Sequence, residues 1–249
     1  MIIFQEIADD HPALDGSPLV RAIRKTAGYI AEHGSIGLTP SKAFKRNFVD
    51  WAAAEFEWPG YSSEELYSVN KALNEMDFPP LMDIHDLLIA LKIGRHRKGK
   101  FTLTKYGREL IDHPGKMFGV VTPFYLFEMD HERFARRHEK VFGNWDVFLN
   151  VLNVEAENGA AGSEIRTTLY GAPDNDQAFD TTLSSFYIQV LRPLCWVGLM
   201  HETRASGPSS KDAVYMKSPL WNAALQLETD AYLTGADAET LLRLRTNFQ

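Results

Sequence analysis

The stretch KIGRHRKGKFTLTKYGR, residues 92–108, decides the fold that this sequence predicts. Within it, RHRKGKFTLT reads as two short strands around a tight turn at Lys98-Gly99-Lys100, because apolar Phe101 and Leu103 alternate with two threonines. Thr104 can then cap a short helix with the sequence KYGRELI. The stretch therefore predicts a β-hairpin followed directly by a helix.

Upstream of this hairpin, the sequence predicts a series of amphipathic helices. Ser17-Pro18 marks the start of the first helix, which runs to Gly34. Thr39-Pro40 marks the start of a second helix, and Ser62 with Glu65 has the S-x-x-E form of a capping box. The helix that follows this box carries a stripe of Leu66, Val69, Leu73 and Met76, and the last helix carries Leu81, Ile84, Leu87, Leu88 and Leu91 before Gly94 ends it.

Helix, short strand, helices and then a hairpin is the element order of a winged helix. The segment LKIGRHRKGKFTLTKYGREL resembles the end of many winged-helix domains, in which an apolar helix leads into a glycine, a basic wing and an L-T-x-x-G turn. This resemblance covers roughly residues 80–112, and it implies a winged-helix fold for the first part of the chain.

The second half repeats the same plan. Its apolar stripes lead to a glycine break in GAAGSEIRTTLYG with a cap at Ser163, and then to Gly198. The longer segment LMHETRASGPSSKDAVYMKSP predicts a second hairpin with SGPSS at its tip, and Ser218-Pro219 opens a helix behind it. The stripes consist of Trp145, Phe148, Leu149 and Leu152, and of Phe186, Tyr187, Val190, Leu191 and Leu194.

The predicted fold class is α+β and mostly helical, with two tandem winged-helix-like modules. The first module spans residues 1–112 and contains the basic wing, and the second spans residues 142–249 with a C-terminal helix. Residues 113–141 form a connector with a helix near Pro123 to Lys140, because this segment is neither rich in serine nor low in complexity.

As a whole, the chain resembles an uncharacterised bacterial family first noted among plasmid open reading frames. Members of that family pair an LTPS-type strand-to-helix turn with a basic L-T-x-x-G wing. The residues that carry the resemblance are Leu38, Thr39, Pro40, Ser41, Arg97, Lys98, Gly99, Leu103, Thr104 and Gly107. The resemblance covers about half of the chain, and it implies a winged-helix fold without any assigned reaction.

The composition indicates a globular protein in the cytoplasm. Hydrophobic residues make up 45% of the 249 residues, and no apolar run approaches the ~20 residues that span a bilayer. The N-terminus lacks the basic lead of a signal peptide. The single cysteine, Cys195, lies among apolar neighbours, which favours a reduced and buried thiol.

No motif of the sequence predicts a catalytic site, a cofactor or a metal site. His131 and His138 are seven residues apart, too far along a helix to share one metal ion. Arg133, Arg136, Arg137 and Lys140 share a helical face, which we expect to be salt-bridged to Glu132 and Glu139. His85 with Asp83 or Asp86 could form a base with its orienting carboxylate, but their positions beside the apolar stripe favour plain surface residues. We therefore expect a protein that is not an enzyme.

The basic segment favours a contact with nucleic acid. Residues 92–108 hold seven Lys or Arg and no acid, whereas the whole chain has a net charge of -7, so the other residues carry -14. A crowded set of cations is relieved by binding a polyanion, and DNA is the possible partner. The predicted nucleic-acid-binding residues are Arg95, Arg97, Lys98, Lys100, Lys105 and Arg108.

Two observations leave a protein-docking role open as the alternative. The helix before the wing would present Asp83, His85, Asp86 and Lys92, and none of these forms the bidentate contacts that Arg, Asn or Gln make with bases. The second module offers only Gln189 and Arg192 on its helix, and Arg204 and Lys211 on its wing. We therefore expect phosphate contacts with modest sequence preference if DNA is bound, and docking of a protein partner otherwise.

Overall fold

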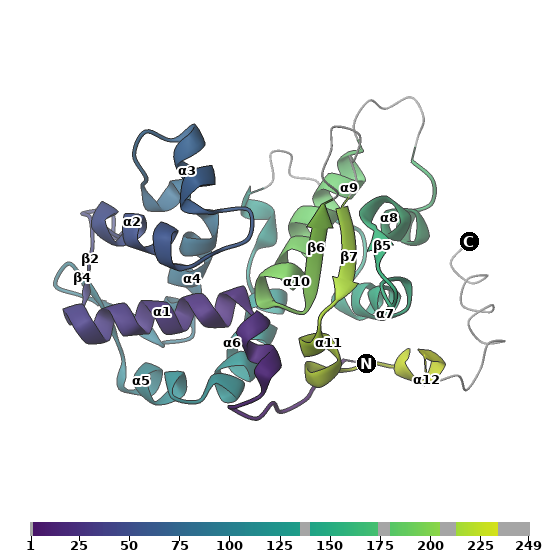
Figure 1. Cartoon of the computed structure of the whole chain (residues 1–249), viewed down its shortest axis with the longest axis horizontal. Helices are drawn as coiled ribbons and strands as arrows, with labels where there is room; N and C mark the ends of the chain where they lie inside the picture. The colour runs from purple at the N-terminus through teal and green to yellow at the C-terminus, as the bar shows by residue number, and fades with distance from the viewer. Residues whose placement is uncertain (1, 135–139, 174–179, 205–212, 234–249) are drawn as a thin grey trace. The chain divides into compact units, whose positions relative to one another are not determined.

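The computed structural model describes residues 2–134, 140–173, 180–204 and 213–233 (Figure 1). It is a mostly helical α+β structure whose contacts divide the chain into two compact units. Residues 6–125 form the first unit, and the residues up to Gln5 join the chain from Leu126 onwards in the second unit. This division falls within helix α6 (Pro114–Glu128). The module boundaries after residues 112 and 141 remain predictions from the sequence.

The helices of the first unit begin and end largely where their capping residues predict. Ser17 accepts a hydrogen bond from the backbone N–H of Val20 at 3.2 Å, and Gly34 ends the helix at a φ of 76°. Ser62 and Glu65 form the predicted capping box. These helices are α1 (Pro18–His33), α2 (Arg46–Glu55), α3 (Ser63–Val69), α4 (Pro79–Ala90), α5 (Lys105–Ile111) and part of α6, with short 3-10 helices η1 (Pro12–Gly16) and η2 (Glu75–Asp77).

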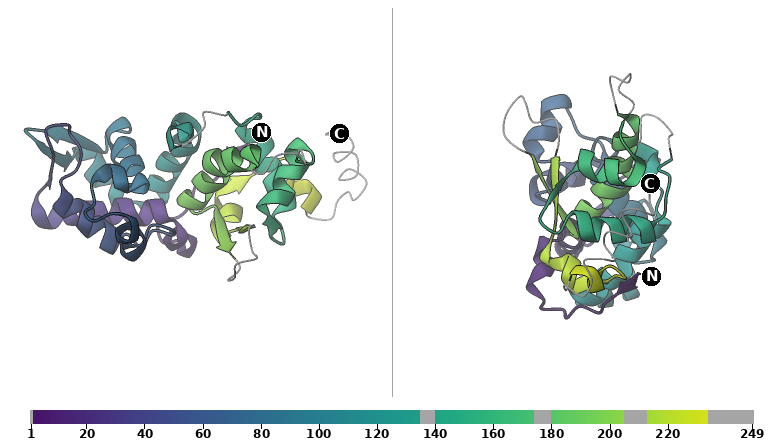
Figure 2. Two further views of the ribbon diagram at one scale, coloured as in Figure 1. Left: turned by 90° about the horizontal axis from the view of Figure 1, so that it is seen from above. Right: turned by 90° about the vertical axis from the view of Figure 1, so that its right-hand side faces the viewer.

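A three-stranded antiparallel sheet completes the first unit. Strand β4 (Lys100–Leu103) lies between β2 (Ile36–Gly37) and β3 (Gly94–Arg97). The predicted alternation is confirmed, because Phe101 and Leu103 are buried on one face of β4. The ring of Phe101 packs edge-on against Phe44, which in turn contacts Phe48 on α2. In the view from above, the hairpin lies at one end of this unit (Figure 2).

The predicted start of the second helix at Thr39-Pro40 is wrong. Helix α2 begins at Arg46, and residues 39–43 form a turn that returns Phe44 to a bridge with Leu38. The backbone N–H of Thr39 donates to the carbonyl of Ala43 at 2.8 Å, and Lys42 takes a left-handed φ of 69°. The hydroxyl of Thr39 donates to the same carbonyl at 3.2 Å, so its side chain stabilises this turn and does not cap a helix.

Two further helix predictions in the first unit need correction. The helix after the capping box ends at Val69, and Val69 and Met76 are 80% and 73% exposed, so they do not belong to a buried stripe. Helix α4 ends at Ala90 with Leu91 as its C-cap, and Gly94 starts strand β3 instead of ending the helix. Lys92 supplies the left-handed conformation there, with a φ of 58°.

The L-T-x-x-G turn joins the hairpin to α5 through a single hydroxyl group. Thr104 Oγ1 donates to the carbonyl of Lys92 at 2.7 Å and accepts from the N–H of Gly107 at 2.9 Å. A side chain at Gly107 would place its Cβ 2.1 Å from the carbonyl oxygen of Ile93. Only glycine allows this approach, because α5 lies directly on the backbone that precedes the hairpin.

The second unit has the same order of elements and the same sheet topology. Strand β7 (Ala213–Lys217) lies between β5 (Ala160–Ala161) and β6 (Met200–Arg204), as β4 lies between β2 and β3. The helices are α7 (Trp145–Glu155), α8 (Gly162–Tyr170), α9 (Thr181–Phe186), α10 (Arg192–Val197), α11 (Pro219–Ala224) and α12 (Asp230–Leu233). A 3-10 helix η3 (His131–Phe134) precedes them, and a π-helical turn η4 (Tyr187–Leu191) joins α9 to α10.

The turn behind the second hairpin repeats the hydrogen bonds of the first. Ser218 Oγ donates to the carbonyl of Gly198 at 2.6 Å and accepts from the N–H of Trp221 at 3.3 Å. Gly198 has a φ of 85° and takes the place that Lys92 has in the first unit. The predicted cap at Ser218 is therefore confirmed, and the two units share the detailed structure of this turn.

Two predicted elements from residue 113 onwards differ from the structure. Helix α8 begins at Gly162 with Ala161 as its N-cap, so Ser163 lies inside the helix and does not cap it. The predicted connector helix near Pro123 to Lys140 matches a helix only up to Glu128, where α6 ends, and its residues 135–139 lie outside the described residues. The SGPSS tip of the second hairpin lies outside the described residues.

A short two-stranded sheet closes the second unit. Strand β1 (Ile3–Phe4) pairs antiparallel with β8 (Leu225–Gln226), and the ring of Phe4 packs edge-on against Phe127. Among the described helices, none combines the length and the apolar character that crossing a bilayer requires.

Candidate functional site

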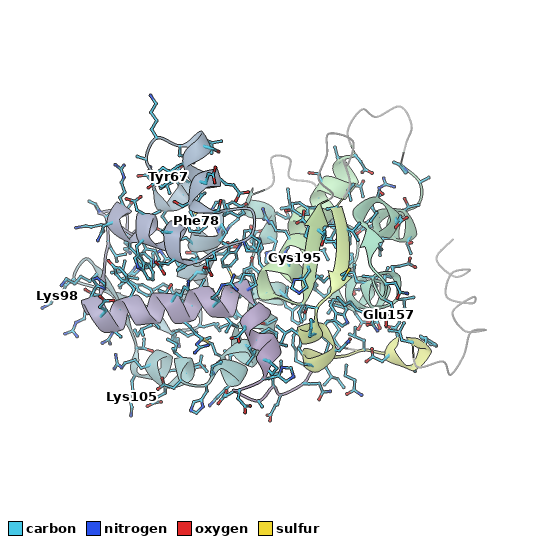
Figure 3. The ribbon with its side chains drawn as sticks, in the orientation of Figure 1. Tyr67, Phe78, Lys98, Lys105, Glu157 and Cys195 are labelled. Atoms are coloured by element: carbon cyan, nitrogen blue, oxygen red, sulfur yellow. The ribbon has the colours of Figure 1, made fainter. Side chains whose placement is uncertain are left out.

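The basic hairpin is built around a two-residue turn. Lys98 and Gly99 both have positive φ angles, 49° and 71°, and Arg97 pairs with Lys100 across the turn. This is the geometry of a type I′ turn, which matches the twist of the two strands. Lys98 therefore lies at the outer tip of the hairpin, where its side chain points away from the helices (Figure 3).

The strand register sorts the hairpin side chains onto two faces. Arg95 lies opposite Thr102 and Arg97 lies opposite Lys100, so these cations share the outer face. His96 lies opposite Phe101 on the inner face, which packs on the unit's core. Two like charges directly opposite each other destabilise a strand pair, and Arg97 with Lys100 is such a pair.

All six predicted site residues are exposed, but they differ in their partners. Lys105 is paired with Glu109 at 3.7 Å, one helical turn later on α5. Arg108 donates from Nη1 to the carbonyl of Leu103 at 3.1 Å. Within the described part of the chain, the side chains of Arg95, Arg97, Lys98 and Lys100 have neither a hydrogen bond nor an ion pair. The hairpin cations are thus a set of four, here called the wing cations, and the two on α5 are held locally.

The prediction that Asp83 and His85 are surface residues is wrong. Their exposed fractions are 4% and 6%, although both lie on α4 beside the apolar stripe. Asp83 is buried because its carboxylate accepts a hydrogen bond from the hydroxyl of Tyr125 at 2.8 Å. Of the residues expected on this face, Asp86 and Lys92 are exposed.

The second unit does not present the expected base-reading residues either. Arg192 is only 8% exposed and its guanidinium lies over the ring of Trp196 at 4.8 Å. Gln189 accepts a hydrogen bond from the backbone N–H of Val141 at 3.1 Å. Several residues of the sequence predictions lie outside the described part of the chain: Lys211, Arg136, Arg137, His138 and Glu139, together with the side chain of Arg204. Lys140 is paired with Glu132 at 3.9 Å, as expected.

A chain of three titratable side chains lies beneath the hairpin. Glu75 Oε1 accepts a hydrogen bond from Nδ1 of His85 at 2.5 Å, and its other oxygen accepts the backbone N–H of Phe44 at 2.7 Å. Nε2 of His85 faces Nε2 of His96 at 2.8 Å. Glu75 and His85 are both buried, and the His85 ring stacks on Phe44 at 3.9 Å between ring centroids. No local sequence pattern marks this cluster, because its members lie ten and eleven residues apart on different elements.

A surface hollow of about 390 Å³ opens over this cluster. Its wall combines polar groups with apolar side chains of η2 and α4, including Met76, Met82 and Ile89. Burial, the neighbouring imidazole of His85 and the charge of Lys42 lower the pKa of His96 below its ordinary value. The polar residues at the hollow are Ser41, Lys42, Glu75, His85, Asp86 and His96.

The surroundings of Cys195 do not favour a reactive thiol. Its side chain is partly covered, and burial followed by the charge of Glu202 raises the pKa of its thiol. A raised pKa disfavours the thiolate, which is the nucleophilic form. Across the described ranges, no group of three or more His, Cys, Asp or Glu side chains is arranged to hold a metal ion.

Two family models match the chain in tandem. The Y4jL N-terminal domain matches residues 15–116, and the y4jL C-terminal domain matches residues 135–219. A relative from Sinorhizobium fredii (strain NBRC 101917 / NGR234), the "Uncharacterized protein y4jL", is 37% identical over 173 residues. That alignment covers 68% of this chain and 78% of the relative. The chain belongs to the y4jL family.

Membership of the y4jL family confirms part of the predicted resemblance: the family has two domains and a bacterial relative that is named as uncharacterized. The two family domains lie in the two units of the structure, one in each. No solved structure matches the chain. The family descriptions name no fold and no activity.

Proposed function

We propose that both units are winged-helix-like modules and that the chain binds DNA through the β3–β4 hairpin as a basic wing. Support for the fold comes from the shared element order, in which a helix, a strand and further helices precede a hairpin. In both sheets the last strand lies between the first and the second. The first strand of each hairpin is therefore an edge strand of a three-stranded sheet, and its second strand is the central one. A regulatory role would suit such a protein.

The observation that carries the DNA proposal is the set of four wing cations. They are exposed, and within the described residues none of them has an anionic partner, although the chain holds 33 acidic residues. Arg97 and Lys100 face each other directly. Phosphates would relieve this repulsion, and the counterions that they release would drive binding.

The proposed contact is with phosphates and has little sequence preference. The exposed part of α4 carries Asp86 and Ala90, with half-buried Met82 and Ile89 beside them. None of these side chains forms the bidentate hydrogen bonds that distinguish base pairs in the major groove. The net charge of -7 also opposes the approach of DNA at long range. We therefore expect weak binding to generic duplex, with a Kd of about 10⁻⁴ to 10⁻⁶ M at physiological salt.

The test replaces all four wing cations, Arg95, Arg97, Lys98 and Lys100, by alanine. If each cation neutralises one phosphate, the slope of log K against log salt should flatten by about 0.9 per charge, or roughly 3.6 in all. Fluorescence anisotropy of a labelled duplex at several salt concentrations measures this slope. Circular dichroism checks that the variant is folded, which we expect because the four side chains are exposed.

A second quadruple variant separates the local effect from the change in net charge. Arg24, Arg46, Lys71 and Lys116 are exposed cations of the same unit that lie outside the hairpin. Their replacement by alanine removes the same total charge and should change the salt slope much less. Absence of binding by the unmodified chain at low salt, or equal effects of both variants, would rule out the wing as a DNA contact.

The alternative is a protein-docking module that uses the face of α4. It is favoured by one observation: Met76, Met82 and Ile89 line the same surface hollow, and Met76 is 73% exposed. Such apolar side chains suit a protein partner better than a phosphate backbone. In a pull-down of the native complex, a partner that is lost with Ile89→Asp but retained without the wing cations would support docking and argue against DNA.

A further inference from the structure

The two histidines beneath the hairpin face each other through their ring nitrogens. Nε2 of His85 and Nε2 of His96 are 2.8 Å apart, so a single proton lies between two lone-pair sites. His85 comes from α4 and His96 from β3, and neither belongs to the outer face that carries the wing cations. The pair therefore has a chemistry that the proposed DNA contact does not use.

The orientation of His85 is fixed from behind by a buried carboxylate. Glu75 accepts a hydrogen bond from Nδ1–H of His85, and in the neutral ring this tautomer leaves Nε2 as an acceptor aimed at His96. Packing holds the ring in this position, because it stacks on Phe44 and meets Phe101 edge-on. A carboxylate that orients an imidazole through its other nitrogen is the usual outer-shell arrangement of a metal-binding histidine.

We propose that His85 and His96 bind a divalent transition-metal ion through their Nε2 atoms, with Glu75 as the positioning residue behind His85. The ion takes the place of the shared proton. Bonds of 2.0–2.1 Å to zinc in tetrahedral geometry place the two nitrogens about 3.3 Å apart, with the ion off the line that joins them. The nitrogens therefore need to separate by about 0.5 Å, and the rings need to turn so that both lone pairs point at the ion. His96 lies on an exposed strand and can make this adjustment.

Water completes the coordination of the ion. In the described part of the chain no third His, Cys, Asp or Glu side chain joins the pair around a common point, but the hollow of about 390 Å³ leaves room for solvent. Imidazole ligands favour zinc, copper and nickel over magnesium or calcium. Lys42 lines the same hollow and opposes a cation, whereas Asp86 in that wall favours one.

The test measures binding of Zn²⁺ to the full chain by isothermal titration calorimetry, and of Cu²⁺ by electron paramagnetic resonance. His96→Ala should weaken Zn²⁺ binding at least tenfold and remove one nitrogen from the Cu²⁺ spectrum. Glu75→Gln should weaken binding about 10–100-fold. His33→Ala is the control, because His33 stacks on Tyr29 of α1 and does not line the hollow.

A variant that is expected to strengthen metal binding adds a second test. Lys42→Asn removes the positive charge and keeps a residue that tolerates the left-handed backbone at φ 69°, so it should strengthen metal binding. Circular dichroism shows that each variant is folded, and His96 is exposed enough for its replacement to be tolerated. No Zn²⁺ or Cu²⁺ binding by the unmodified chain, or binding unchanged in His96→Ala, would overturn the proposal.

Discussion

At the scale of single residues, Gly94 is constrained by the aromatic ring that it faces. A Cβ at this position would lie 2.0 Å from Cζ of Phe101. That ring cannot easily move aside, because it is fully buried and contacts Phe44, His85 and His96. Gly94 starts β3, so the constraint acts at the base of the hairpin that carries the wing cations.

We predict that Gly94→Ala destabilises the first unit by roughly 1–3 kcal/mol, because the added methyl group overpacks the core against Phe101. Gly28→Ala is the matched control. Gly28 lies inside α1 with no atom within 4 Å of an added Cβ, so this change should stabilise the unit by about 0.5–1 kcal/mol. Urea unfolding followed by circular dichroism measures both. Midpoints that shift in the same direction would contradict the packing around Gly94.

Single residues also mark the limit of what the sequence predicts. Capping residues such as Ser17, Ser62 and Thr104 were identified correctly, because their partners lie three residues away along the chain. Asp83 and His85 were placed on the surface, and both are buried. Their partners, Tyr125 and Glu75, lie on other elements, and periodicity within one helix carries no information about them.

At the scale of elements, the hairpins were the most predictable part of the fold. The first needs only alternation along four residues and a turn with Gly99, and both are local. The helix start at Thr39-Pro40 was wrong because a turn with Lys42 in the left-handed region competes for the same backbone groups. The exposure of the wing cations is equally local, since a hairpin's outer face follows from its register.

The repeated turn differs between the units in what packs behind it. Gly107 of the first unit is replaced by Trp221 in the second, and the indole N–H of Trp221 donates to Oδ1 of Asn153 at 3.0 Å. Nζ of Lys217 donates to the same oxygen at 3.1 Å and also contacts Glu157. Asn153 on α7 is 1% exposed and thus connects α7, β7 and α11 through one buried amide.

We predict that Asn153→Leu destabilises the second unit by about 3–5 kcal/mol. The two side chains have similar size, but leucine leaves the buried indole N–H of Trp221 and one N–H of the Lys217 ammonium without this acceptor. An unsatisfied buried group costs roughly 1–3 kcal/mol, more when charged. Adding Trp221→Phe should recover part of the loss, because it removes one orphaned donor. Urea unfolding of the single and double variants measures the coupling. Strictly additive effects would show that the amide does not serve Trp221.

At the scale of the whole molecule, strand β1 near the start of the chain pairs with strand β8 near residue 225, and the sequence did not predict this pairing. Ile3 pairs with Gln226 and Phe4 with Leu225, so the first strand belongs to the second unit. A two-residue strand has no detectable pattern of its own, and its partner lies more than 200 residues later. The sequence analysis assigned residues 1–112 to one module from continuity along the chain, and continuity carries no information about such a distant partner.

This pairing gives a prediction that separates the two units. The backbone N–H of Gln5 donates to the carbonyl of Ala224 at 2.8 Å, and Gln5→Pro removes that donor. The loss of one hydrogen bond should cost about 0.5–1.5 kcal/mol locally. Gln5→Ala is the control, because it removes the side-chain contact with Gln226 and keeps the backbone donor.

Hydrogen exchange followed by mass spectrometry measures the effect in the full chain. Gln5→Pro should speed exchange in peptides that cover α11 and β8, because Ala224 and the paired Leu225 lose their neighbouring strand. Peptides of the β3–β4 hairpin should exchange as before, because they belong to the first unit. Equal acceleration in both regions would show that the two units unfold together, and no acceleration at β8 would show that the first strand does not pair there.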